Sequence, residues 1–188
     1  MPRSLSLAPL GALILACAAP ALAQPADPNT AQTRAVRTTG QMTLDGRDSE
    51  AVWQEAPVAD DFYQFAPAEA APARFRTTIR VAYDDRVLYV FVKAYDPRPD
   101  SLVALLSRRD LRTPSEWIKV VIDGFRDRRS ALQFMVNPAG VKRDATVYSD
   151  VAEDIAWDGV WDAATAVDAE GWTAEFAIPF SQLRFTPK

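Results

Sequence analysis

Histidine is absent from this chain of 188 residues, and cysteine occurs only once, as Cys17. The lack of histidine excludes Ser-His and Cys-His catalysis, and it excludes zinc or haem held by histidine. Any general acid or base in the chain must therefore be Asp, Glu, Lys or Tyr. The net charge of -4 argues against a nucleic-acid partner, because nucleic-acid-binding proteins carry a basic surface.

The first residues have the features of a secretory signal peptide. Arg3 supplies a positive charge, residues 5–16 are apolar but too short to span a membrane, and Ala21-Leu22-Ala23 fits signal peptidase. We expect residues 1–23 to be removed, which leaves a mature chain without thiol chemistry or a disulfide. An alternative interpretation treats the four residues that end at Cys17 as a lipobox, with a lipid on that cysteine.

The rest of the chain reads as a short leader followed by one domain. Residues 24–40 are polar and contain proline, so we expect a flexible leader. The domain is expected to occupy residues 41–188. Hydrophobic residues make up 48% of the chain, which is enough to build a packed core without disulfides.

Alternating apolar and polar residues predict that this domain is built from β-strands. Three hairpins and one further strand are expected, over residues 75–94, 118–136, 161–178 and 143–148. The strand at residues 87–94 is apolar on both faces and should therefore be central in its sheet. Helix is expected only at residues 48–55 and 101–108. Many short strands with little helix predict an all-β fold, an antiparallel β-sandwich with jelly-roll-like or immunoglobulin-like layering.

Three segments of the sequence resemble carbohydrate-binding module family 9. They are the opening motif Leu44-Asp45-Gly46 with Trp53, the strand at residues 87–96, and the closing run at residues 171–180. They occur in the family's order over residues 42–186. The resemblance implies a β-sandwich that binds a poly- or oligosaccharide, needs no cofactor and carries no catalysis of its own.

The segments between these motifs, such as Arg108-Arg109-Asp110 and Asp158-Gly159-Val160-Trp161, resemble one branch of that family. In this branch the sandwich begins a large secreted protein, and an outer-membrane β-barrel region follows it. The resemblance therefore implies the periplasm or outer membrane of a Gram-negative bacterium. The family usually continues beyond the point where Lys188 ends this chain. We therefore expect a fragment of a longer protein whose sandwich lacks its final strand.

Protein sites for sugars combine flat aromatic rings with planar polar side chains. Trp53, Trp161 and Trp172 lie in or beside core-facing rows and are expected to pack in the interior. Trp157, in an acidic loop, is the first candidate for an aromatic platform, and Trp117 is the second. For both of these residues, packing in the core remains an alternative.

The resemblance also suggests polar contacts for a sugar. By alignment, Asn137 and Asp154 fall where sugar-binding members of the family place polar contacts. Lys119 falls where such members often have an acid, so the resemblance defines the fold better than it defines the ligand.

Carboxylates are concentrated in one stretch of the sequence, at Asp150, Glu153, Asp154, Asp158 and Asp162. Oxygen-rich loops bind Ca²⁺, so Asp150, Glu153 and Asp158 are candidate ligands for a structural calcium ion. A solvated acidic loop is the alternative. A glycosidase would need two of these carboxylates to face each other across a cleft, and we expect no enzymatic activity.

Two functions remain open at this stage. The first is a non-catalytic carbohydrate-binding module associated with glycan breakdown or uptake. The second is a structural or interaction domain attached to an outer-membrane β-barrel, with no retained sugar site. Two exposed aromatic rings that face each other would favour the first, whereas burial of Trp117 and Trp157 beside an exposed edge strand would favour the second.

Overall fold

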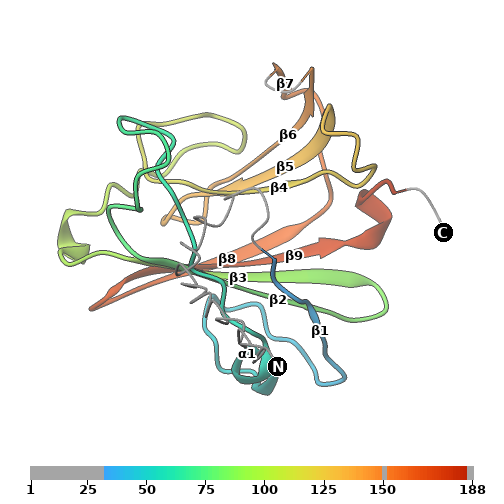
Figure 1. Ribbon diagram of the computed structural model, residues 1–188, viewed down its shortest axis with the longest axis horizontal. Helices are drawn as coiled ribbons and strands as arrows, with labels where there is room; N and C mark the ends of the chain where they lie inside the picture. The colour runs from blue at the N-terminus through green and yellow to red at the C-terminus, as the bar shows by residue number, and fades with distance from the viewer. Residues whose placement is uncertain (1–31, 150–151, 186–188) are drawn as a thin grey trace, which may run out of the picture.

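The computed structural model describes residues 32–149 and 152–185, which form a β-sandwich of two facing sheets (Figure 1). The strands are β1 (Val36–Arg37), β2 (Thr77–Tyr83), β3 (Val87–Tyr95), β4 (Ile118–Ile122), β5 (Ser130–Val136), β6 (Lys142–Tyr148), β7 (Ala152–Asp154), β8 (Asp162–Asp168) and β9 (Gly171–Pro179). One sheet has the order β1-β2-β3-β9-β8, and the other has the order β4-β5-β6-β7. The predicted β-sandwich is therefore confirmed.

The three predicted hairpins are present as β2–β3, β4–β5 and β8–β9, all antiparallel. Strand β3 lies between β2 and β9 and pairs with both along its length. Its central position explains why its side chains are apolar on both faces, since one face meets the second sheet and the other meets a covering segment.

The main core lies between the two sheets and is rich in aromatic side chains. The ring of Trp161 stacks on Phe176, with centroids 5.8 Å apart, and Phe134 meets Trp161 edge-on at 5.3 Å. Trp172, on β9, is also buried in this cluster. The expectation that Trp161 and Trp172 pack in the interior is confirmed.

A second, smaller core lies on the outer face of the five-stranded sheet. The segment at residues 42–56, here called the strap, crosses this face and ends in the helix α1 (Ala51–Glu55). Trp53 on α1 is fully buried and packs on Phe91 at 5.6 Å between ring centroids, which confirms its predicted packing role. The strap approaches the sheet closely at Gly46, where a Cβ atom would lie 2.8 Å from the backbone of Thr165.

Three expectations from the sequence are corrected. The fold begins before residue 41, because Val36 and Arg37, within the predicted leader, pair in parallel with the otherwise open edge of β2. Residues 102–108 are not helical, and the helix predicted over 101–108 is replaced by the 3₁₀ turn Pro99–Ser101 and an irregular loop. Part of the predicted acidic loop is the edge strand β7, which pairs with β6.

The signal peptide and the first part of the leader, residues 1–31, lie outside the described residues. Among the residues that the structure does describe, no helix is long and apolar enough to cross a membrane.

Candidate functional site

A cleft of about 540 Å³, here called the groove, opens between the sheets beside the edge strand β4. Its lining residues come from both sheets and from the loops that precede β2 and β4: Phe62, Thr77, Ile79, Val92, Ala94, Glu116, Trp117, Ile118, Lys119, Val120, Val121 and Trp172. An adjoining cavity of about 280 Å³ shares four of these residues and extends to Phe75 and Asp96. The groove is therefore mainly apolar, with charged groups at its rim.

Two aromatic side chains in the groove are accessible to a ligand. Trp117 is half-buried, and its indole Nε1 donates a hydrogen bond to the carbonyl of Thr113 at 3.2 Å. Phe62, which comes from the loop before β2, keeps 40% of its surface exposed. The groove thus combines an indole held in place by its own loop with a second ring at the rim.

Side-chain hydrogen bonds hold the loop before β4 in place. The hydroxyl of Ser115 donates to the carbonyl of Val103 at 2.9 Å and accepts from the backbone N–H of Leu105 at 2.8 Å. The backbone N–H of Glu116 also donates to Val103. These contacts connect the two ends of the loop and so fix the position of Trp117 at the start of β4.

Two cationic side chains near the groove pair with one carboxylate of the four-stranded sheet. Lys119 Nζ lies 3.3 Å from Glu153 Oε1, and Arg143 Nη2 donates to Glu153 Oε2 at 2.8 Å. The hydrogen bond from Arg143, opposed by desolvation and helped by Lys119, lowers the pKa of Glu153. Glu116 is an exposed carboxylate that lines the groove.

Trp157 lies in a different cavity from Trp117. This cavity, of about 300 Å³, includes Ile122 at the far end of β4, and it shares no lining residue with the groove. Trp157 is half-buried and contacts Phe134 edge-on at 5.8 Å, so part of its ring belongs to the core. The two predicted platforms therefore do not face each other.

Asn137 has a structural role in the turn between β5 and β6. The residue is fully buried. Its amide group donates to the carbonyl of Leu105 and to Ser115, and its carbonyl oxygen accepts from the N–H groups of Ala139 and Val141. These four bonds use every donor and acceptor position that its side-chain amide offers. No atom of that amide remains for a sugar, contrary to what the alignment suggests.

The remaining predicted residues do not converge. Asp154 is exposed on β7 and accepts a hydrogen bond from the backbone of Ala156. Of the calcium candidates, Glu153 is paired with Arg143 and Lys119, Asp158 is paired with Arg109, and Asp150 lies outside the described residues. Within residues 32–149 and 152–185, no group of three carboxylates is arranged to hold a metal ion.

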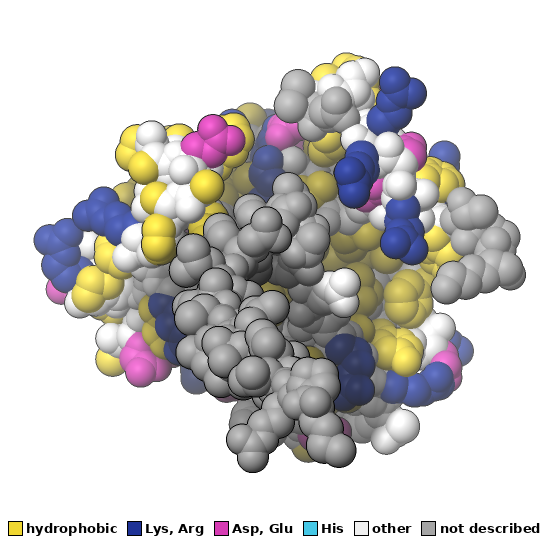
Figure 2. Space-filling model, viewed as in Figure 1, with side chains coloured by type: hydrophobic (Ala, Val, Ile, Leu, Met, Phe, Trp, Pro, Cys, Tyr) yellow, Lys and Arg dark blue, Asp and Glu magenta, His cyan; other side chains and the backbone are white. Residues whose placement is uncertain are grey.

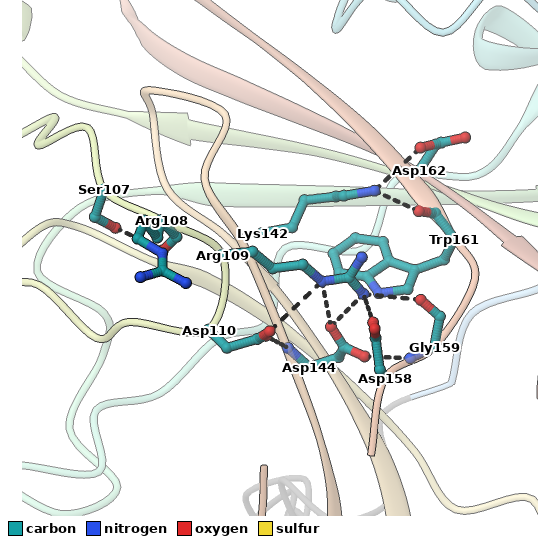
Figure 3. A network of polar contacts seen from close by, with 10 residues as sticks. All are labelled: Ser107, Arg108, Arg109, Asp110, Lys142, Asp144, Asp158, Gly159, Trp161 and Asp162. Atoms are coloured by element: carbon teal, nitrogen blue, oxygen red, sulfur yellow. Dashed lines mark hydrogen bonds and ion pairs between the residues drawn. The ribbon is translucent and has the colours of Figure 1, made fainter. Parts of the chain in front are cut away.

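An ion pair with a fully buried carboxylate joins Arg109 to Asp144 between the sheets (Figure 3). Asp144 is fully buried on β6, and its carboxylate accepts from Arg109 Nη2 at 2.7 Å and from the backbone N–H of Gly159. Arg109 also donates to the carbonyl of Gly159 and pairs with Asp158 at 2.8 Å. Burial lowers the pKa of Arg109, but the hydrogen bond and charge of Asp144 outweigh it, so the pKa is raised.

This network joins the two segments that resemble the family branch, because it fastens the loop before β4 to β6 and to the segment before β8. In Figure 3, Asp110 lies beside Asp144, and its carboxylate accepts a hydrogen bond from the backbone N–H of Asp144 at 3.3 Å. Both carboxylate oxygens of Asp144 accept hydrogen bonds from the chain itself. We infer that the network has a structural role, which is to hold the loop before β4 in place beside the groove.

Hydrophobic side chains are also exposed around the groove's loops. Figure 2 shows them in yellow at the upper left, over the loops that precede β2 and β4 in Figure 1. Exposed members of these loops include Phe62, Phe65 and Leu106. Phe62, Phe75 and Glu116 were not predicted from the sequence as site residues. For Phe62 and Phe75, one signal was available: they are aromatic residues in a stretch, 57–76, that is otherwise rich in alanine, proline and charged residues.

Comparison with known proteins identifies the architecture. No family model and no curated protein matches the chain. Two solved structures of a carbohydrate-binding module family 9 domain from Caldicellulosiruptor kristjanssonii, in complex with glucose and with cellotriose, each superpose with a TM-score of 0.54. The fold is that of carbohydrate-binding module family 9.

Sequence identity to these structures is low, at 17% and 19%, over 82% of this chain and 73% and 69% of theirs. A candidate carbohydrate-binding protein from Bacteroides uniformis superposes with a TM-score of 0.60 and 14% identity, over 79% of this chain and 72% of that protein. The family 9 fold expected from the sequence motifs is therefore confirmed, and at these identities the similarity describes the architecture.

Proposed function

We propose that this chain is a non-catalytic module that binds a saccharide in the groove beside β4. The observation that carries the proposal is the placement of Trp117 and Phe62 in one cleft with Glu116 at its wall. Aromatic faces pack against the C–H surfaces of a sugar ring, and a carboxylate can accept hydrogen bonds from its hydroxyl groups.

The size of the groove and the fold support this proposal. A volume of about 540 Å³ falls within the range of small-molecule sites, which are concave and mainly apolar with a few polar groups. Proteins of the same fold were solved with glucose and with cellotriose bound. We therefore take a neutral mono- or oligosaccharide as the ligand class.

Calorimetric titration of the purified protein with glucose and with cellotriose tests the proposal. Trp117→Ala should weaken binding by at least about tenfold, because a central aromatic ring is a typical energetic hot spot. Phe62→Ala should weaken binding less, since it removes a rim contact. Phe65→Ala is the matched control, because Phe65 comes from the same loop, is 92% exposed and lines neither the groove nor its adjoining cavity.

Two results would contradict this assignment. Loss of binding in Trp157→Ala, with Trp117→Ala unaffected and both variants folded, would place the sugar in the other cavity. Absence of binding to a cooperatively folded wild-type protein would favour the alternative function, a structural domain attached to an outer-membrane β-barrel.

The cellular setting and metal content are also proposals that rest on the sequence. We propose secretion through the signal peptide to the periplasm or outer membrane, and association with glycan breakdown or uptake. A barrel region that follows this domain in a longer protein remains a proposed partner. A structural calcium ion is also a proposal. The pairing of Glu153 and Asp158 with cationic side chains gives it little support.

A further inference from the structure

A buried carboxylate fastens the strap to the outer face of the five-stranded sheet. Glu175 on β9 is fully buried, and its Oε2 accepts hydrogen bonds from the backbone N–H groups of Asp45 at 3.2 Å and Gly46 at 3.1 Å. On the same strand, the hydroxyl of Thr173 donates to the carbonyl of Gly46. The tight turn of the strap is therefore held by side chains of β9.

Two carboxylate oxygens, one on the strap and one on β9, are buried without a hydrogen-bond partner. They are Oε1 of Glu175 and Oε2 of Glu50, the residue that precedes α1 on the strap. The other oxygen of Glu50 accepts from the backbone N–H of Thr43 at 3.2 Å. A buried polar atom without a partner is costly and calls for an explanation.

One proton held between the two carboxyl groups would supply the missing interaction for both residues. Ionised carboxylates only accept hydrogen bonds, so two of them cannot satisfy each other, whereas a protonated carboxyl can donate to a neighbouring carboxylate. We propose that Glu50 and Glu175 share one proton, and that this proton closes the strap onto the sheet as a pH-dependent latch.

The electrostatic surroundings favour this protonation. Burial raises the pKa of Glu175 to about 7; the hydrogen bonds from Gly46 and Asp45 oppose the rise, and the charges of Glu50 and Asp45 add to it. Two carboxylates of the strap therefore act on Glu175 in the same direction as burial.

In the described part of the chain, the cations that the neighbouring strands place on this face are already paired. Lys93 on β3, opposite Thr173, is paired with Asp168 and lies 3.6 Å from Glu170. On β3, Tyr89 is a neutral phenol whose pKa is raised to about 12, first by burial and then by Asp84, with a contribution from Glu175. On β2, Arg80 lies in the same cross-strand row as Glu175, but it is paired with Asp48 at 3.4 Å. On β8, Asp162 is paired with Lys142 at 3.1 Å.

The direction of the pH effect follows from the raised pKa. The folded protein holds the proton more tightly than the unfolded chain, so the stabilisation is complete below the ordinary pKa of glutamate, about 4.3, and is lost as the pH rises through about 7. Above that pH the carboxylate of Glu175 is charged, and the strap should open locally. We expect the folding equilibrium constant to fall on the order of 100-fold between pH 5 and pH 8 through this site.

Urea denaturation from pH 4.5 to 8.5 tests the latch. Glu175→Gln should remove most of the pH dependence, because the amide can donate to Glu50 at every pH. Glu50→Gln should weaken the dependence without abolishing it, because the charge of Glu50 is removed while the burial of Glu175 remains. Glu55→Gln is the matched control: this residue is an exposed glutamate on α1, and its replacement should leave the wild-type dependence intact.

Carbon-13 NMR of the Glu175 carboxyl group in the wild-type protein decides the matter even if a variant fails to fold. A midpoint near pH 7, with faster amide exchange at Asp45 and Gly46 above it, is the expected result. A midpoint near the ordinary value for glutamate, or an unchanged pH dependence in Glu175→Gln, would overturn the proposal. Stabilisation of the wild type by CaCl₂ at pH 8, absent in Glu175→Gln, would also overturn it, because a cation would then replace the proton.

Discussion

Replacing Asp144 by alanine should destabilise the protein by about 3 kcal/mol, the lower end of the range for breaking one partner of a buried ion pair. The replacement leaves the N–H of Gly159 without its acceptor and removes the central anion beside Arg109. We place the effect at the lower end because the side chain of Arg109 is 35% exposed and keeps its contact with Asp158. Urea denaturation at neutral pH measures the loss.

Asp158→Ala is the matched control for this prediction. Asp158 contacts the same guanidinium group at 2.8 Å, but its side chain is 76% exposed. An exposed partner of this kind typically contributes less than about 1 kcal/mol. Equal losses of stability in the two variants would mean that the burial of Asp144 does not matter, which would contradict our account of the network.

Replacing Trp53 by alanine should cost about 3–5 kcal/mol, the range for removing a buried indole from a core. Trp53 is fully buried and, together with Phe91, is central to the small core beneath the strap. Truncation would leave a cavity that rigid backbone on both sides cannot fill. Urea denaturation should show the loss, and hydrogen exchange should show faster exchange in the strap than between the sheets.

Two further variants sharpen the prediction for Trp53. Trp53→Phe should cost less, because a phenyl ring can still pack on Phe91 and the indole Nε1 has no hydrogen-bond partner to lose. Gln54→Ala, at the exposed neighbouring position of α1, should change stability by no more than about 0.5 kcal/mol. Unchanged exchange in the strap of Trp53→Ala would contradict the role of this residue.

The sequence predicted the strands well where burial leaves a local pattern. Strand β3 is apolar on both faces because it is covered on both sides, and the hydrophobicity of neighbouring residues is sufficient to show this. Trp161 and Trp172 were assigned to the core for the same reason. Strand β1 could not be predicted in this way. Its two residues form a strand only because they pair with the edge of β2, which is distant in the sequence.

The candidate site was only partly predictable. Trp117 was predicted as the second candidate platform, and the structure places it in a cleft. Phe62 joins the same cleft through the loop before β2, and the sequence pattern does not encode that placement. Asn137 was predicted as a sugar contact by alignment, and its side chain is planar and polar. Its environment could not be read from the sequence, because the partners Leu105 and Ser115 come from a loop far away in the chain.

The carboxylates at residues 150–162 show that ion pairing, too, was not predictable from the sequence. Sequence proximity suggested that its carboxylates would gather around a cation. In the folded chain, Glu153 and Asp158 instead meet Arg143 and Arg109, which arrive from other parts of the structure. Ion pairing of this kind depends on strand register, which local composition does not determine.

The central claim is that the groove beside β4 holds a saccharide. A crystal structure of the protein grown with cellotriose tests it most directly. Our account predicts a sugar ring against Trp117 and Phe62, with a hydroxyl group within hydrogen-bond distance of Glu116. An empty groove at saturating cellotriose, or a sugar bound only beside Trp157, would contradict it.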